Sequence, residues 1–153
     1  MLIVNMAPCS RFGAASDGVL ALSWLDELFE RAKAAREKAY APYSHFPVGA
    51  ALRTESGAVF AGCNVENAAF PLGLCAEAGA IAAMVAAGER RIAEILVLGP
   101  KRISPCGACR QRIAEFACEN ATVYLADADG GGEALSFKDL LPLAFGPDAL
   151  ATS

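Results

Sequence analysis

The sequence lacks the features that would point to a membrane or to a polynucleotide. No uninterrupted apolar run approaches the roughly 20 residues of a membrane-spanning helix. Basic residues number 13 against 17 acidic ones, and they form no cluster interleaved with aromatics of the kind that follows a phosphate backbone. The first residues also lack the basic segment of a secretory signal. We therefore expect a cytoplasmic protein with no membrane and no nucleic-acid partner.

A disulfide scaffold is not expected either. The chain has six cysteines, but its 153 residues are enough to bury a core, and the cysteines are unevenly spaced. Free thiols or metal ligands are the better interpretation. Cys9, Cys63 and Cys118 do not stand where a helix should begin, and we expect them to be ordinary core or surface thiols.

Hydrophobic periodicity predicts a single domain in which helices and strands alternate. Apolar residues recur at three- and four-residue spacing over 24–40, which predicts an amphipathic helix. Two strands, 48–53 and 59–64, flank a Ser-Gly turn and should form a hairpin. Downstream the pattern predicts strands over 92–98 and 122–126, helices over 76–87, 107–117 and 136–141, and a Gly-rich connection at 129–132. This order implies an α/β fold in which a mixed β-sheet is sandwiched between helices, in α/β/α layers.

The strongest chemical signal is Cys-Ala-Glu at 75–77, followed about thirty residues later by Pro-Cys-Gly-Ala-Cys at 105–109. Cys106 and Cys109 are three residues apart at the start of a predicted helix, so their sulfurs project from one face. Cys75 opens another predicted helix, and the free N–H groups at a helix N-terminus stabilise thiolates. Three such thiolates could hold a tetrahedral zinc ion with the fourth position left for water, as in a catalytic site.

Glu77 lies two residues beyond Cys75, and residues so spaced do not face each other within a regular helix. Cys75 must therefore sit at the very first turn, with the end of the helix directed into the site. There the Glu77 carboxylate would reach the water on the metal without binding the metal itself. It would accept a proton from that water and pass it to a substrate.

Other interpretations of these residues stay open. Glu77 could be an ordinary first-turn glutamate that complements the helix dipole. Cys106 and Cys109 could form a redox pair, although such a pair has no use for Cys75 or Glu77. A closed structural zinc site could be completed by a fourth cysteine or by His45, the only histidine, which we expect to be exposed and non-catalytic.

The zinc motif has the pattern of zinc nucleobase deaminases, and residues 39–145 resemble the small homo-oligomeric cytidine deaminases. The resemblance extends over Tyr-Ala-Pro-Tyr-Ser-His-Phe-Pro-Val-Gly-Ala-Ala at 40–51, Gly-Cys-Asn-Val-Glu-Asn-Ala at 62–68, Cys-Arg-Gln at 109–111 and Leu-Leu-Pro at 140–142. We accordingly expect a catalytic domain over 23–146, between a variable, Gly/Ala/Ser-rich leader over 1–22 and a tail over 147–153. The implied reaction is hydrolytic deamination of cytidine, and of deoxycytidine, to the uridine product with release of ammonia. It uses one zinc ion per subunit.

The resemblance also implies roles for residues outside the zinc motif. Asn64 and Glu66 would bind ribose hydroxyls, because an ionised carboxylate accepts from hydroxyl donors and an amide both donates and accepts. The ring of Phe46 would pack on the pyrimidine, and the backbone near Ala68 would line the base pocket. Phe145 would reach a neighbouring subunit's pocket in a homotetramer.

The sequence departs from this resemblance at Ala78. Many relatives carry Arg directly after Cys-Ala-Glu, where it donates hydrogen bonds to the metal thiolates. Three thiolates on divalent zinc leave a net negative charge, which the two helix N-termini or Arg110 could offset. Two other functions stay open: deamination of another amino-nucleobase compound, and a non-catalytic structural zinc module.

Overall fold

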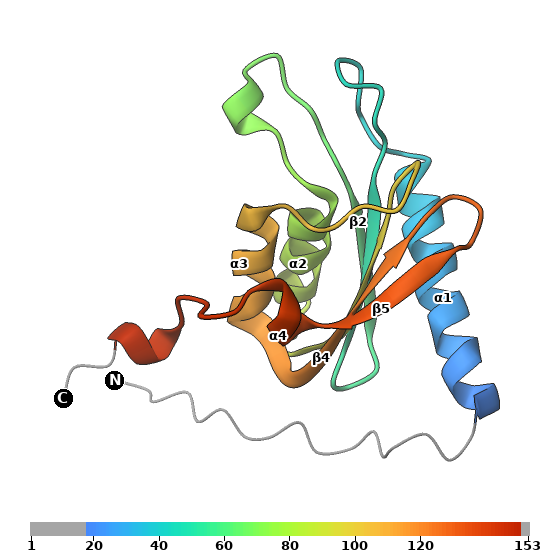
Figure 1. Ribbon diagram of the computed structural model, residues 1–153. Coiled ribbons are helices and arrows are strands. Elements are labelled where there is room, and N and C mark those ends of the chain that lie inside the picture. The colour runs from blue at the N-terminus through green and yellow to red at the C-terminus, as the bar shows by residue number, and fades with distance from the viewer. Residues whose placement is uncertain (1–17, 151–153) are drawn as a thin grey trace.

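The computed structural model describes residues 18–150 and contains a five-stranded sheet. In order across the sheet, the strands are β2 (Val59–Cys63), β1 (Gly49–Thr54), β3 (Ile92–Leu98), β4 (Ala117–Ala126) and β5 (Gly132–Ser136). β3 and β4 run parallel, whereas the other neighbours are antiparallel, so the sheet is mixed (Figure 1). Residues 1–17 and 151–153, which belong to the expected leader and tail, lie outside the described part of the chain.

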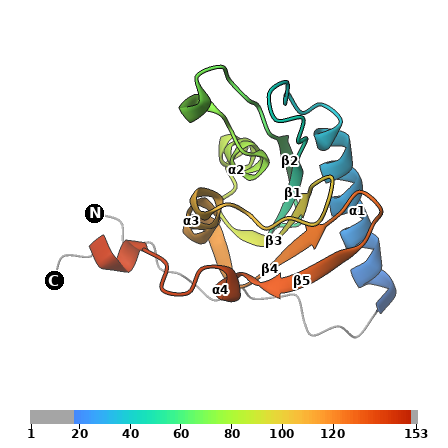
Figure 2. The same ribbon diagram turned by 45° about the horizontal axis from the view of Figure 1, so that its top comes forward.

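Helices cover both faces of the sheet. α1 (Gly18–Arg36) packs on β1, β2 and β3 from one side, and α2 (Ala76–Ala86) and α3 (Gly107–Phe116) lie side by side on the other (Figure 1, Figure 2). A short helix, α4 (Phe137–Leu140), and two 3-10 turns, η1 (Phe70–Leu72) and η2 (Pro147–Leu150), complete the helical elements of residues 18–150. The predicted α/β/α layering is confirmed. Within this range, none of the helices has both the length and the apolar character needed to cross a bilayer.

Side-chain alternation along the central strands supplies both helical layers with apolar partners. In β1, Ala51 belongs to the buried cluster that includes Leu28 of α1. The next residue, Leu52, belongs to the cluster on the opposite face, which includes Met84 of α2. The helices are therefore held against a rigid, fully packed sheet.

The register of the sheet brings three strand ends to one edge. Gly49 in β1 pairs with Cys63 at the end of β2 and with Leu98 at the end of β3, and Leu98 pairs with Ala126 at the end of β4. The segments that leave β2 and β3 lead from this edge to α2 and α3, so the two helices begin near each other. In open α/β sheets, ligands bind outside the carboxyl ends of the strands, which is where these helices begin.

Most element boundaries agree with the sequence expectations, and the hairpin turn is closed by Gly57 with φ 91°. α1 differs, because it begins at Gly18 and ends at Arg36, whereas the expected helix covered 24–40. β4 begins at Ala117, ahead of the predicted start at 122. No strand was predicted over β5, whose sequence Gly-Glu-Ala-Leu-Ser is mostly exposed and contains no β-branched residue.

Candidate active site

The three cysteines of the zinc motif lie at two helix N-termini. Cys75 is the N-cap of α2 and Cys106 is the N-cap of α3, both with extended backbone angles, and Cys109 lies in the first turn of α3. The expectation that Cys75 opens its helix is confirmed. Because the free N–H groups and the positive dipole end of each helix are directed here, both helices favour negative charge at this point.

The sulfur atoms of these cysteines converge. Sγ of Cys75 and Sγ of Cys106 are 3.9 Å apart, and all three sulfurs lie within 4.8 Å of one another. Sulfurs bound to one tetrahedral zinc ion at about 2.3 Å lie roughly 3.8 Å apart, so small side-chain shifts would suffice to hold the ion. Of the described residues, no further His, Cys, Asp or Glu joins the group. A zinc ion held by these sulfurs would keep a fourth position for another ligand.

The thiols differ in burial and in their readiness to ionise. Cys109 is buried, Cys75 is partly exposed and Cys106 is exposed. Burial raises the pKa of the Cys109 and Cys75 thiols, and repulsion from Glu77 and from the neighbouring thiolates adds to the effect. Burial also opposes ionisation of Cys106, but hydrogen bonds from Cys109 and Cys75 outweigh it and lower its pKa. A divalent cation would offset the mutual repulsion within this donor set.

Glu77 lies in the first turn of α2, and only 5% of the residue is exposed. As the second residue of α2, it lies at the helix terminus whose N-cap is Cys75, and its charge opposes ionisation of the three thiols. A glutamate that merely complements a helix dipole is ordinarily solvated. Burial beside three sulfur donors therefore favours a chemical role for Glu77 over a purely helix-stabilising one.

Arg110 secures the loop that precedes α3. Its Nε donates to the carbonyl of Pro105 at 2.9 Å, its Nη1 to the carbonyl of Leu140 at 2.9 Å, and its Nη2 to Oγ of Ser104 at 2.7 Å. These bonds tie the residues directly before Cys106 to α4. Two groups were expected to offset the negative charge of the three thiolates. The helix N-termini are directed at the sulfurs, whereas the guanidinium N–H groups of Arg110 bind the surrounding loop.

A second group of residues is connected to the segment that leads into Cys75, because the segment around Val65 is paired on both sides. Val65 and Leu74, which directly precedes Cys75, exchange backbone hydrogen bonds of 2.9 and 2.8 Å. On the other side, the backbone of Tyr40 donates to Asn64 at 3.1 Å and accepts from the N–H of Glu66 at 2.8 Å. The loops containing Tyr40, Glu66 and Leu74 are thereby held side by side.

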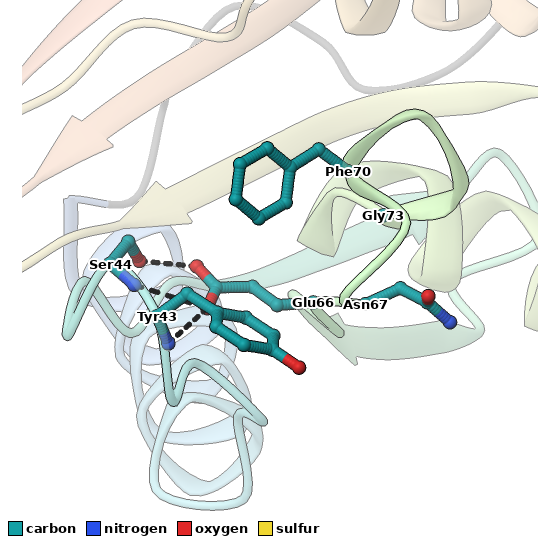
Figure 3. Close-up of a pocket in the computed structure, with 6 residues that line it drawn as sticks. All are labelled: Tyr43, Ser44, Glu66, Asn67, Phe70 and Gly73. Atoms are coloured by element: carbon teal, nitrogen blue, oxygen red, sulfur yellow. Dashed lines mark hydrogen bonds between the residues drawn. The ribbon is translucent and has the colours of Figure 1, made fainter.

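Glu66 lines a cavity of about 370 Å³ formed by these loops (Figure 3). Its Oε2 accepts hydrogen bonds from the N–H groups of Tyr43 at 2.9 Å and Ser44 at 3.2 Å, and its Oε1 accepts one from the Ser44 hydroxyl. The Ser44 hydroxyl is the main cause that lowers the pKa of Glu66, so the carboxylate is ionised at neutral pH. The rings of Tyr43 and Phe70 meet edge to face, with centroids 6.0 Å apart. The cavity is completed by Asn67 and Gly73.

The other expected substrate residues lie outside the lining of this cavity. The side-chain amide of Asn64 accepts from the N–H of Val48 at 2.8 Å and donates to the carbonyl of Phe46 at 3.0 Å. It keeps one further donor and one further acceptor for a ligand. Phe46 is partly exposed and Ala68 is exposed. His45 is exposed, as expected.

Several residues that line the cavity had no predicted role. Tyr43, Ser44 and Asn67 belong to the two sequence runs at 40–51 and 62–68 that carry the resemblance, so a signal for them was present. Phe70 and Gly73 lie in and directly after η1, outside those runs. Their position depends on how the loop between β2 and α2 folds, which no local pattern indicates.

Comparison with known proteins assigns the family. The sequence profile described as "Cytidine and deoxycytidylate deaminase zinc-binding region" matches residues 22–125, which include all three cysteines. A cytidine deaminase from Sporosarcina psychrophila is 44% identical over 131 residues, covering 83% of this chain and 95% of that protein. The chain belongs to the cytidine and deoxycytidylate deaminase family. The zinc cofactor expected from the sequence is confirmed by this zinc-binding region together with the sulfur cluster.

Solved structures of cytidine deaminases share the fold. The crystal structure of cytidine deaminase from Burkholderia pseudomallei superposes with a TM-score of 0.74 at 52% identity, over 78% of this chain and 98% of that one. The cytidine deaminase from Mycobacterium tuberculosis gives a TM-score of 0.71 at 35% identity, over 80% and 97% of the two chains. Both the predicted fold class and the resemblance stated from sequence motifs are therefore confirmed.

Proposed function

We propose that the protein is a zinc-dependent cytidine deaminase that converts cytidine and deoxycytidine to uridine and deoxyuridine with release of ammonia, a step of pyrimidine salvage. The observation that carries the proposal is the convergence of three sulfur atoms within 4.8 Å at two helix N-termini, next to a buried carboxylate. Family membership and the named cytidine deaminases at 44% and 52% identity support the substrate.

The metal site is assigned to Cys75, Cys106 and Cys109, with one zinc ion per subunit. Zinc bound there supplies a Lewis acid that lowers the pKa of water to about 7. The extended N-cap conformation of Cys75 and Cys106 directs their side chains beyond the ends of their helices. The helix N-termini stabilise the accumulated negative charge.

Proton transfer is assigned to Glu77. Its carboxylate takes a proton from the attacking water and delivers it to N3 of the cytosine ring as the C4–O bond forms. The proton of the new C4 hydroxyl then passes through the same carboxylate to the amino group. As the C4–N bond breaks, the C4 carbonyl of the uridine product forms and ammonia leaves. Burial of Glu77 keeps bulk water from competing for these protons.

Substrate contacts are assigned to Phe46 for the base, the backbone near Ala68 for the base pocket, and Asn64 and Glu66 for the sugar. Glu66 lines the cavity and is ionised, which suits a hydroxyl donor. A carboxylate at the sugar repels added phosphate, so a free nucleoside fits this cavity better than a nucleotide.

The assay that tests the function measures ammonia released from cytidine, deoxycytidine and deoxycytidylate by protein of known zinc content. Turnover of the two nucleosides is expected to exceed that of the nucleotide. Ammonia from deoxycytidylate alone would favour a nucleotide deaminase. Zinc-loaded protein that releases ammonia from none of the three would be a deaminase of another amino-nucleobase compound or a structural zinc module, and the proposal would fail.

The functional unit is assigned to residues 23–146 of a homotetramer in which Phe145 lies near a neighbouring subunit's site. Phe145 is 61% exposed, so its ring is free to contact another chain. We place the protein in the cytoplasm, because Cys63, Cys75, Cys106, Cys109 and Cys118 are free thiols, as suits a reducing compartment.

A further inference from the structure

Ser44 links two residues that the proposed function places on the substrate. Its hydroxyl donates to Oε1 of Glu66 and accepts from the N–H of Phe46 at 3.1 Å, while its own N–H donates to Oε2 of Glu66 at 3.2 Å. The N–H of Tyr43 also donates to Oε2, at 2.9 Å. Figure 3 shows the Ser44 side chain and the Glu66 carboxylate directed toward each other at the wall of the cavity.

These bonds limit what Glu66 offers to a ligand. An ionised carboxylate has about four lone-pair sites, two on each oxygen. Both sites of Oε2 are taken by N–H groups, and one site of Oε1 is taken by the Ser44 hydroxyl. One site on Oε1 remains, so Glu66 is prepared to accept a hydrogen bond from a single sugar hydroxyl.

Contacts other than those of the Ser44 hydroxyl also hold the backbone around Ser44. His45 has φ 54°, in the left-handed region that residues other than glycine seldom adopt, and its N–H donates to the carbonyl of Ala41 at 3.1 Å. The Asn64 side chain holds the residues that follow, through Phe46 and Val48. Removal of the Ser44 hydroxyl should therefore free Oε1 of Glu66, while the two backbone N–H groups still bind Oε2 and the turn stays closed.

We propose that Ser44 is a positioning residue for nucleoside binding: its hydroxyl orients the Glu66 carboxylate toward one sugar hydroxyl and fixes that carboxylate relative to Phe46. The inference rests on the proposed function, because positioning matters only when a nucleoside occupies the cavity. A ligand without ribose hydroxyls gains nothing from an oriented Glu66. Ser44 therefore contributes to the discrimination between nucleosides that carry these hydroxyls and those that lack them.

The test compares Ser44→Ala with the wild-type, zinc-loaded full chain. We expect KM for cytidine and the inhibition constant of uridine to rise about tenfold, as for a lost hydrogen bond to a charged group, while kcat changes by less than about twofold. The inhibition constant of 2′,3′-dideoxyuridine, which lacks the 2′- and 3′-hydroxyls at which we expect Glu66 to bind, should stay within about twofold of its wild-type value. Ser44→Thr keeps the hydroxyl and should restore uridine affinity.

Two controls separate positioning from a general effect on the fold. Ser56→Ala removes a similar bond, from Oγ to the Glu89 carboxylate at 2.7 Å, at the hairpin turn away from the cavity, and it should leave the nucleoside constants unchanged. Adding Ser44→Ala to Glu66→Ala should cause no further loss.

The outcomes distinguish the inference from the function on which it rests. Equal weakening of uridine and 2′,3′-dideoxyuridine by Ser44→Ala would overturn the positioning role and leave the deaminase assignment intact. Unchanged constants for both ligands would do the same. If the wild-type protein released no ammonia from cytidine, both would be overturned.

Discussion

Glu77 lies in the first turn of α2, where any carboxylate stabilises the helix dipole. The two roles make different demands on the charge. Dipole stabilisation requires only a negative charge near the helix end, whereas proton transfer requires a group that both gains and loses a proton. Glutamine keeps the size of the side chain but has no carboxylate, so it separates the two roles.

Glu77→Gln should retain zinc and lose activity. We expect kcat for cytidine to fall by at least roughly 100- to 10,000-fold, the contribution of a missing general acid–base group. Ammonia release is measured together with the zinc content of the same preparation. Glu115→Gln, an exposed change in α3, is the matched control and should keep full activity. Wild-type turnover by a zinc-replete Glu77→Gln variant would contradict the assignment.

The cysteine cluster was predictable at the residue scale, whereas the cavity was not. The three-residue spacing of Cys106 and Cys109 places them within one helical turn, and Cys75 stands at the start of a predicted helix. The contact between Ser44 and Glu66 joins residues 22 positions apart in two loops. No periodicity encodes such a contact, because it depends on how Val65 is paired with both neighbouring segments.

At the element scale, the position of α2 depends on its close contact with β2. A Cβ added to Gly62 of β2 would lie 2.4 Å from the N atom of Ala80 and 2.6 Å from the carbonyl oxygen of Ala76. Both are backbone atoms of α2, so no side-chain rotation could relieve the clash. Glycine at this position therefore allows the close approach of α2 to β2. The position of α2 in turn determines where Cys75 and Glu77 lie relative to α3.

Gly62→Ala should displace α2 and weaken the metal site. We expect a loss of about 1–3 kcal/mol in the free energy of unfolding, as for an overpacked core, and a weaker zinc affinity. Urea denaturation at fixed protein concentration and competition with a chelator measure the two effects. Gly146→Ala is the control, because an added Cβ there meets no atom within 4 Å. Unchanged zinc affinity in Gly62→Ala would show that the packing of β2 does not position the ligands.

Strands and helices whose own sequence carries an apolar pattern were predicted. Those that form because a neighbouring element pairs with them were not. The segments of β1 and β2 are short, mostly apolar runs on either side of a turn that closes at a glycine with positive φ. β5 has a mostly exposed sequence and is a strand because it pairs with β4 from Thr122 to Ala126. Similarly, α1 begins at Gly18, within the stretch over 1–22 that was expected to be a leader.

At the scale of the whole molecule, large apolar side chains remain exposed on a single chain. Phe70 in η1 is 76% exposed, and Leu143 and Phe145 in the C-terminal segment are exposed as well. The backbone of this segment is held against α3, because Nε2 of Gln111 donates to the carbonyl of Phe145 at 2.7 Å. The backbone of Phe145 is therefore held near α3 while its side chain is exposed, as the proposed contact with a neighbouring chain requires.

A homotetramer should be found by light scattering on the zinc-loaded protein, and Phe145→Ala should weaken it. Removal of an aromatic side chain buried between subunits costs about 2 kcal/mol or more, which corresponds to a roughly 30-fold or greater rise in the dissociation constant. The molar mass is followed on dilution, and kcat/KM should fall with the mass, because in the proposed tetramer the subunits share their sites. Leu150→Ala is the control, since Leu150 is 70% exposed farther along the chain, and it should leave mass and activity unchanged. A monomer with full activity in the wild-type protein would exclude shared sites, and an unaltered tetramer in Phe145→Ala would place its ring outside the interface.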